Sequence, residues 1–147
     1  MIRTIRPYAP EDLVPMLNTW ERANRLAHPF MTDAFIAQER YNIPNVYMPH
    51  AETWIIEQDG HVIGFLALIG NEVGGLFVDP AHHGTGAGFA LMNKAKDLRG
   101  DLEVEVFKVN TIGRRFYDRY GFTLMHETMH EPTGQPVLRL RHQGIAT

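Results

Sequence analysis

The stretch that decides how this chain folds is Val78-Asp79-Pro80-Ala81-His82-His83-Gly84-Thr85-Gly86-Ala87-Gly88-Phe89. An apolar run from Glu72 to Val78, typical of a strand, leads into it, and a helical pattern begins at Phe89. Glycines between a strand and a helix leave backbone N–H groups exposed, and the first turn of a helix adds a positive potential. The stretch therefore predicts an anion site, suited to a phosphate or pyrophosphate, where a strand passes into a helix.

Two common phosphate-binding motifs do not match this loop. A P-loop requires Lys and then Ser or Thr after its last glycine, whereas Phe89 and Ala90 follow Gly88. The dinucleotide-binding fingerprint requires a glycine three residues after its second one, and Phe89 occupies that position. The loop is therefore expected to hold an anion through its backbone without either motif.

Patterns on both sides of the loop predict a mixed α/β layer. Asp59-Gly60 lies between the apolar runs 54–57 and 61–69, which is typical of a β-hairpin. Pro15 is expected to cost the first helix a hydrogen bond or to bend it. The other expected elements are a strand over 2–6, helices over 10–28 and 33–41, a broken helix or loop over 42–50, a strand over 72–78, a helix over 89–98, a strand over 102–109, a helix over 111–120, and strands near 122–131 and 137–141.

Composition limits the classes of function. The chain has 147 residues, 44% hydrophobic and 21% charged, which fits one soluble domain over residues 1–147. It contains no Cys and no Ser, which excludes disulfides, thiolate metal sites and the nucleophiles of cysteine and serine enzymes. The formal charge is −3, and no apolar run reaches the roughly 18 residues of a membrane span. We therefore expect a cytoplasmic protein that binds neither nucleic acid nor membrane.

A second group of residues lies further along the chain: Asn110, then Phe116-Tyr117, then Gly121-Phe122. Phe116-Tyr117 alone is typical of a helix core, although a Tyr hydroxyl near a cofactor can donate a proton at neutral pH. Together and in this order, the glycine loop and this group resemble the GNAT superfamily of acyl-CoA N-acyltransferases. Further similarity to its small bacterial members of the YiaC and YjaB type lies at Trp20, His28-Pro29-Phe30, Tyr47 and Trp54.

The resemblance covers nearly the whole chain and implies its fold and reaction. The fold would be α/β (α+β in some schemes): one GNAT-like domain, with a mixed, mostly antiparallel sheet of about six to seven strands flanked by about four helices. The reaction would move an acetyl group from acetyl-CoA to an amine, in a protein lysine, a protein N-terminus or a small molecule. The absence of Cys and Ser favours direct attack in a ternary complex of a monomer or homodimer. The alternative is a non-catalytic acyl-CoA-binding module that senses its ligand.

The resemblance also assigns roles to residues. Tyr117 is expected to contact the cofactor and to act as general acid, and Asn110 to contact CoA. An N–H group near Phe77 or Val78 would polarise the thioester carbonyl. The expected CoA contacts are the backbone of Leu76, Phe77 and Val78 for the pantetheine arm, beside a bulge at Gly74-Gly75, and the N–H groups of His83, Gly84, Thr85, Gly86, Ala87 and Gly88 for the pyrophosphate.

Two points remain open at this stage. The candidates for the general base are Glu72, Glu105 and His28, and the sequence does not choose among them. The family's loop usually begins with Arg or Gln, whereas this one begins with His83, and a neutral imidazole would contribute less charge toward the pyrophosphate.

His126-Glu127-Thr128-Met129-His130 matches the H-E-x-x-H pattern of zinc proteases. The pattern requires a helix, so that both His share one face, and a third ligand. On a strand, the two His would lie about 13 Å apart, too far for one zinc ion. We therefore treat a metalloprotease as a remote alternative and expect no metal.

Overall fold

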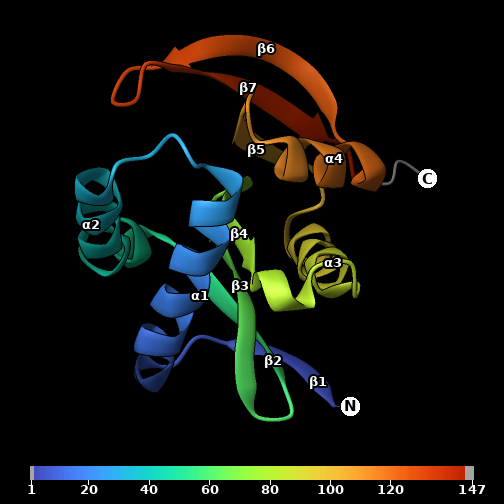
Figure 1. Cartoon of the computed structure of the whole chain (residues 1–147). Helices are drawn as coiled ribbons and strands as arrows, with labels where there is room; N and C mark the ends of the chain where they lie inside the picture. Colours follow the sequence, from blue (N-terminus) through green and yellow to red (C-terminus); the bar gives the residue numbers. More distant parts are fainter. Residues whose placement is uncertain (1, 145–147) are drawn as a thin grey trace.

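The computed structural model describes residues 2–144. Its strands form one seven-stranded sheet in the order β1-β2-β3-β4-β5-β7-β6, and helices lie over it (Figure 1). The strands are β1 (Arg3–Pro7), β2 (Glu52–Gln58), β3 (His61–Ile69), β4 (Glu72–Val78), β5 (Leu102–Phe107), β6 (Thr123–His130) and β7 (Gln135–His142). The helices are α1 (Leu13–Ala27), α2 (Asp33–Asn42), α3 (Ala87–Arg99) and α4 (Thr111–Tyr120), with the short turns η1 (Pro10–Asp12), η2 (Ile43–Tyr47), η3 (Met48–His50) and η4 (Pro80–His82). The predicted sheet and helices are confirmed.

The hairpin of β2 and β3 forms as its sequence predicts. Asp59 and Gly60 have φ values of 51° and 83°, the conformation of the two-residue turn that matches the twist of paired strands. Neighbouring residues of these strands then face opposite sides. Ile56 and Leu66 join the cluster under α3, whereas Ile55 and Phe65 join the cluster under α1 and α2. Both faces of the sheet are therefore covered by helices.

The sheet opens between β4 and β5. The register passes from Ala67 opposite Gly75 to Leu68 opposite Val73, so Gly74 is the extra residue of a bulge, as expected. The parallel ladder of β4 and β5 consists of Glu72 with Glu103 and Val73 with Val104. Beyond these two pairs, β4 and β5 are not paired with each other, and the facing edges of the two strands separate. The sheet therefore divides into a four-strand part and a three-strand part.

Arg139 holds the two parts together where they meet. This residue of β7 donates to Glu72 of β4 at 2.9 Å and to Glu103 of β5 at 3.0 Å. Its side chain is only 22% exposed, so solvent screens the ion pairs less than on an open surface.

Two helical predictions need correction. The helix predicted from Phe89 begins at Ala87, because Gly86, at a φ of 89°, turns the chain directly into it. Pro15 is the third residue of α1, where backbone N–H groups have no partner within the helix, so the predicted loss of a hydrogen bond does not arise. Residues 42–50, left open as broken helix or loop, extend α2 through η2, a π-helix, and η3, a 3₁₀ helix.

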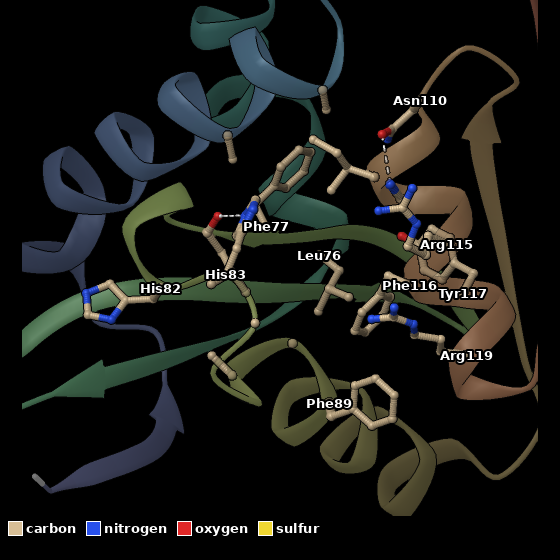
Figure 2. A pocket seen from close by; sticks show the side chains of 18 of the residues that line it. Leu76, Phe77, His82, His83, Phe89, Asn110, Arg115, Phe116, Tyr117 and Arg119 are labelled. Atoms are coloured by element: carbon tan, nitrogen blue, oxygen red, sulfur yellow. Dashed lines mark hydrogen bonds between the residues drawn. The ribbon is translucent and has the colours of Figure 1, made fainter.

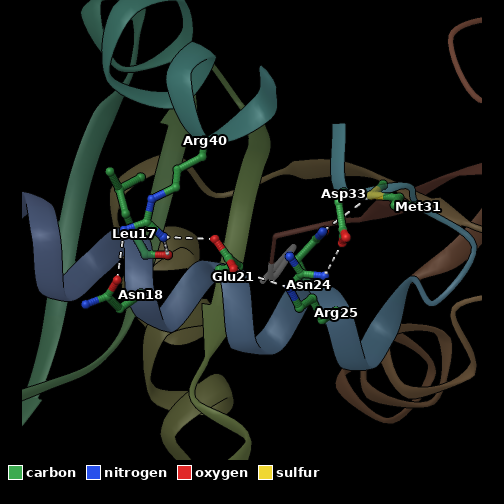
Figure 3. Close-up of polar contacts among 8 residues, drawn as sticks. All are labelled: Leu17, Asn18, Glu21, Asn24, Arg25, Met31, Asp33 and Arg40. Carbon is green, nitrogen blue, oxygen red and sulfur yellow. Dashed lines mark hydrogen bonds and ion pairs between the residues drawn. The ribbon is translucent and has the colours of Figure 1, made fainter. Parts of the chain in front are cut away.

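Two arginines link α1 and α2: Arg25 of α1 pairs with Asp33 of α2 at 3.0 Å, and Arg40 of α2 contacts α1. Arg40 donates to the carbonyl oxygen of Leu17 at 3.2 Å, to Glu21 at 3.1 Å and to Asn18 at 2.8 Å (Figure 3). α2 and η2 thereby form a wall beside the opening in the sheet. Within residues 2–144, none of the helices has the length and apolar character that crossing a membrane requires.

Candidate functional site

The glycine loop has the backbone conformation that its sequence predicts. Gly84 and Gly86 have φ values of 72° and 89°, a region that residues with a Cβ rarely adopt. The guanidinium of Arg3 donates to the carbonyl oxygen and the hydroxyl of Thr85, which fixes the middle of the loop. The loop ends at the N-terminus of α3, a 13-residue helix, so its N–H groups and the helix potential act together.

His83 folds back onto the strand that precedes the loop. Its Nε2 lies 2.8 Å from the carbonyl oxygen of Val78, to which it donates. The imidazole therefore satisfies a carbonyl at the open end of β4. His83, which stands where the family usually has Arg or Gln, thus has a hydrogen-bond partner within the protein.

A cleft of about 370 Å³ opens between this loop and α4, and we call it the basic cleft. Figure 2 shows Arg115 and Arg119 extending from α4 on one side, and His82 and His83 on the other. None of its lining side chains within the described residues is a carboxylate. Of the expected CoA-binding residues, Thr85 is not in its lining, which includes Leu76, Phe77, Val78, His83, Gly84, Gly86, Ala87, Gly88, Asn110 and Tyr117.

A second cleft, of about 430 Å³, lies on the other side of the opening, and we call it the acidic cleft. Its charged lining residues are Glu39, Glu72 and Glu105, and within the described part of the chain neither Lys nor Arg lines it. Wall and floor come from α1, α2, η2 and the small residues of the β4 bulge. A cationic group would therefore be favoured there, as an anionic one would be in the basic cleft.

The two clefts share five residues: His28, Leu76, Phe77, Asn110 and Tyr117. The shared residues come from α1's C-terminal end, from β4 and from α4, so segments far apart in the sequence meet at the opening of the sheet. This junction is where a group bound in one cleft can reach a group bound in the other.

Tyr117 is buried at this junction. Its ring packs edge-to-face against Phe116 and Phe122, with ring centres 5.4 Å apart in both pairs. Burial raises the pKa of its hydroxyl well above the usual value of about 10, because the phenolate would lose its solvation. The phenol therefore keeps its proton at any physiological pH, as a proton donor must.

His28 and Asn110 contact each other across the same junction. Nε2 of His28 lies 3.3 Å from Nδ2 of Asn110, and Nδ1 of His28 lies 2.8 Å from Oδ1 of Asn24. Oδ1 of Asn110 caps α4 by accepting the N–H of Gly113. Burial lowers the pKa of His28 to about 4. Asn110 thus has protein partners as well as a place in the basic cleft.

The other two candidate bases differ in their surroundings. Glu72 is paired with Arg139 at 2.9 Å. Glu105 is exposed on β5 and lines the acidic cleft. Successive residues of a strand face opposite sides, so Glu105 shares a face with Phe107, whose ring packs against His28 at 4.9 Å.

The zinc-protease pattern lies on strand β6, where His126 is paired with Arg139 and His130 with Gln135. The helix that the pattern requires is therefore not formed. Nδ1 of His130 lies 2.8 Å from the hydroxyl of Thr133. Within residues 2–144, no three His, Asp or Glu side chains gather as a metal site would require.

Several lining residues were not predicted. Asn24 occupies a position in α1 four residues before His28, a spacing that places two helical side chains side by side, and this was the available signal. Arg115 and Arg119 have the same spacing on α4. The hydroxyl of Tyr47 donates a hydrogen bond to Glu39 at 2.8 Å. Tyr47 is the last residue of the π-helix η2, which no local pattern indicated.

The sequence is similar to those of known acetyltransferases. The family model described as "Acetyltransferase (GNAT) domain" matches residues 49–124. The chain is 28% identical to the peptidyl-lysine N-acetyltransferase YjaB of Salmonella typhimurium, over 92% of this chain and 94% of that protein. It is 26% identical to the peptidyl-lysine N-acetyltransferase YiaC of Escherichia coli, over 90% of this chain and 91% of that protein.

Solved structures show the same fold. The solution structure of apo-form YjaB from Escherichia coli superposes with a TM-score of 0.86 at 24% identity, covering 99% of this chain and 100% of that one. The PaiA N-acetyltransferase of Thermoplasma acidophilum, solved in complex with coenzyme A, gives a TM-score of 0.75 at 19% identity, covering 95% and 98%. The GNAT model spans more than half of the chain, including β2 to α4 and the glycine loop. The chain belongs to the GNAT family of acetyltransferases.

Proposed function

We propose that this protein transfers an acetyl group from acetyl-CoA to the side-chain amine of a lysine in a protein or peptide, by direct attack in a ternary complex. One observation carries the proposal: a basic cleft and an acidic cleft meet at Tyr117. An anionic acyl donor and a cationic acceptor would then approach the same point from opposite sides. The names of the YjaB and YiaC relatives support peptidyl lysine as the acceptor.

The basic cleft would hold acetyl-CoA. Its pyrophosphate would rest on the N–H groups of residues 83–88, assisted by Arg115 and Arg119. The pantetheine arm would take the place of a ladder partner along the outer edge of β4, at Leu76 to Val78, where β5 is not paired. A backbone N–H near Phe77 would polarise the thioester carbonyl.

The reaction needs three proton movements. The lysine ammonium first gives one proton to Glu105 through water, and Glu105 releases it to solvent. The neutral amine nitrogen then bonds to the thioester carbon, the C–S bond breaks, and the departing thiolate takes the proton of the Tyr117 hydroxyl. The second proton that leaves the nitrogen passes through water to the Tyr117 oxygen and restores the phenol. A lysine amine has a pKa of about 10.4 and is mostly protonated at neutral pH, so a base is required. Glu105 is the best of the three candidates, because Glu72 is held by Arg139 and the Nε2 lone pair of His28 faces Asn110.

A direct assay tests the proposal. The purified protein is mixed with acetyl-CoA and a peptide that has one lysine and a blocked N-terminus, and free thiol and peptide mass are followed. Thiol release with one acetyl group added to the lysine is expected. A Lys→Arg peptide, a peptide with a free N-terminus and a small polyamine test the acceptor. If acetyl-CoA binds tightly but no thiol is released with any of these acceptors, the result would contradict catalysis. The chain would then have the role of an acyl-CoA-binding sensor.

A further inference from the structure

Asn24, His28 and Asn110 form a hydrogen-bonded row where the basic and acidic clefts meet. The row joins α1 to the first turn of α4, and His28 and Asn110 are 82 residues apart in the sequence. The three residues are only 3%, 8% and 9% exposed. Burying polar side chains is costly unless their hydrogen bonds are made, so the partners of each atom are informative.

The hydrogen bonds of the row fix the protonation of the imidazole. Nδ2 of Asn24 donates to the sulfur of Met31 at 3.3 Å (Figure 3), so Oδ1 of Asn24 faces His28. Oδ1 of Asn110 accepts the N–H of Gly113 at 2.8 Å, so Nδ2 of Asn110 faces His28. The imidazole must therefore donate from Nδ1 and accept at Nε2, which makes it neutral.

The helix start is shaped around this row. A Cβ at Gly113 would lie 2.6 Å from Nδ2 of Asn110, closer than real contacts allow. The glycine therefore lets the amide of Asn110 fold over the first turn of α4 and reach His28. Asn110 is the N-cap of α4, and Tyr117 lies on that helix four residues after Gly113, so the row is joined to the helix that carries Tyr117.

A charged imidazole would break the row. A proton on Nε2 would point at the N–H of Asn110, and two donors would face each other. Burial supports the neutral form by lowering the pKa of His28 to about 4. The rings of Phe30 and Phe107 pack against the imidazole at 5.7 and 4.9 Å. The titratable side chains that share its clefts are His82, His83, Arg115 and Arg119 in the basic cleft, Glu39, Tyr47, Glu72, Glu105 and His130 in the acidic cleft, and Tyr117 in both.

We propose that His28 is a positioning residue: as a neutral acceptor for Asn110 it fixes the first turn of α4 and thereby the placement of Tyr117 toward the transferred acetyl group. Its lone pair is used by Asn110 and takes no proton from the amine. The proposal rests on the acetyl transfer proposed above, and it adds Asn24 as the residue that sets the tautomer of His28.

The first test compares two substitutions of His28 by steady-state kinetics. Gln in His28→Gln can donate to Asn24 and accept from Asn110, but it cannot act as a base, whereas His28→Leu loses both bonds. We expect kcat of His28→Gln to stay within about threefold of the wild type. We expect kcat of His28→Leu to fall about tenfold, because of its two lost bonds only the one to Asn110 bears on the start of α4. The control is His61→Gln, an exposed histidine of β3. Equal, large losses in both His28 variants would overturn the proposal and make His28 a base.

The second test places a carboxylate beside the imidazole of His28. The carboxylate introduced by Asn24→Asp would raise the pKa of His28 and favour the imidazolium. We expect the pH profile of kcat to gain a new acidic limb, with activity recovering as the pH rises and the imidazole becomes neutral. If His28 were a base, the same carboxylate would strengthen it and raise kcat near neutral pH. An increase in kcat at that pH would therefore contradict the positioning role.

A third measurement does not depend on activity. Long-range ¹H–¹⁵N spectra of the wild-type protein, assigned with His28→Gln, report which imidazole nitrogen carries the proton. We expect a neutral ring protonated at Nδ1 at pH 7. A proton found at Nε2 would contradict the proposed hydrogen bonds among Asn24, His28 and Asn110, even if the enzyme is active. If the wild type transfers no acetyl group, the proposed function fails, while this spectrum still tests the row.

Discussion

Arg3, in the first strand, donates to both the carbonyl oxygen and the hydroxyl of Thr85, at 2.9 and 2.7 Å. Its Nε is in turn fixed by Gln58 at 2.8 Å. The N-terminal strand therefore holds the middle of the glycine loop in place.

We expect Arg3→Lys, which keeps the charge but loses the planar fork, to weaken acetyl-CoA binding about three- to tenfold with little change in kcat. Titration calorimetry measures this, with Arg141→Lys, an exposed position of β7, as the control. Unchanged affinity would mean that the loop needs no support.

Gly86 turns the chain into α3 at a φ of 89°, with open space where a Cβ would stand. We expect Gly86→Val to raise the Kd for CoA more than tenfold, because the side chain would intrude on the N–H groups and strain the backbone by roughly 1–2 kcal/mol. Gly60→Val, at a φ of 83° in the β2–β3 turn, imposes the same strain away from the loop. A folded Gly86 variant with wild-type affinity would remove the loop from the binding site.

Tyr117→Phe keeps the ring and its packing but removes the proton donor. We expect kcat to fall about 10–100-fold where chemistry limits turnover, with the affinity for acetyl-CoA little changed. The raised pKa of Tyr117 also predicts that wild-type activity shows no decline from this group up to about pH 10. A variant with full activity, in conditions where chemistry is shown to be limiting, would leave Tyr117 as a packing residue.

Glu105→Gln removes the proposed base without changing its size. At pH 7 we expect kcat with a lysine peptide to fall about 100-fold, and to recover partly at higher pH, where more of the amine is neutral. Glu72→Gln, at the same cleft but in the ion pair with Arg139, should cost much less. A larger loss of kcat in Glu72→Gln than in Glu105→Gln would instead assign the role of base to Glu72.

Buried His28 also predicts how stability depends on pH. Its pKa is about 4 in the folded protein and 6.5 when unfolded, so the unfolded chain binds the proton more readily in between. The free energy of unfolding should therefore decrease as the pH falls from about 6.5 to 4, by up to about 3 kcal/mol. His28→Gln should show a smaller decrease in urea titrations, with a remainder from His142, whose pKa is also lowered by burial, whereas Asp12 and Asp79, whose pKa values are lowered, act at more acidic pH. Equal slopes in both proteins would contradict a buried neutral His28.

Much of this fold could be predicted because its signals are local. Asp59-Gly60 between two apolar runs is sufficient for the β2–β3 hairpin, and Gly121, at a φ of 108°, ends α4 where expected. The start of α3 was two residues off because a glycine N-cap gives no side-chain signal. The Pro-rich segment 42–50 stayed ambiguous because proline is tolerated at the start of each short turn.

The candidate site was only half predictable, for a physical reason. The glycine loop and Tyr117 belong to single segments, so their spacing is visible in the sequence. The opposite charge of the two clefts depends on Glu39 and Arg119, which only the folded sheet brings near one junction. The partner of His28 lies 82 residues away, and pairing at that distance leaves no local pattern.

Arg139 takes no part in the proposed chemistry, yet its guanidinium is an electrostatic link between the two parts of the sheet. It pairs with Glu72 of β4 and with Glu103 of β5. Through Glu72, which also lines the acidic cleft, this link bears on the geometry of the opening where the two substrates would meet. Because the Arg139 side chain is only 22% exposed, added salt should weaken this link less than it weakens the exposed ion pairs of the surface, so the opening should keep its geometry across ionic strengths.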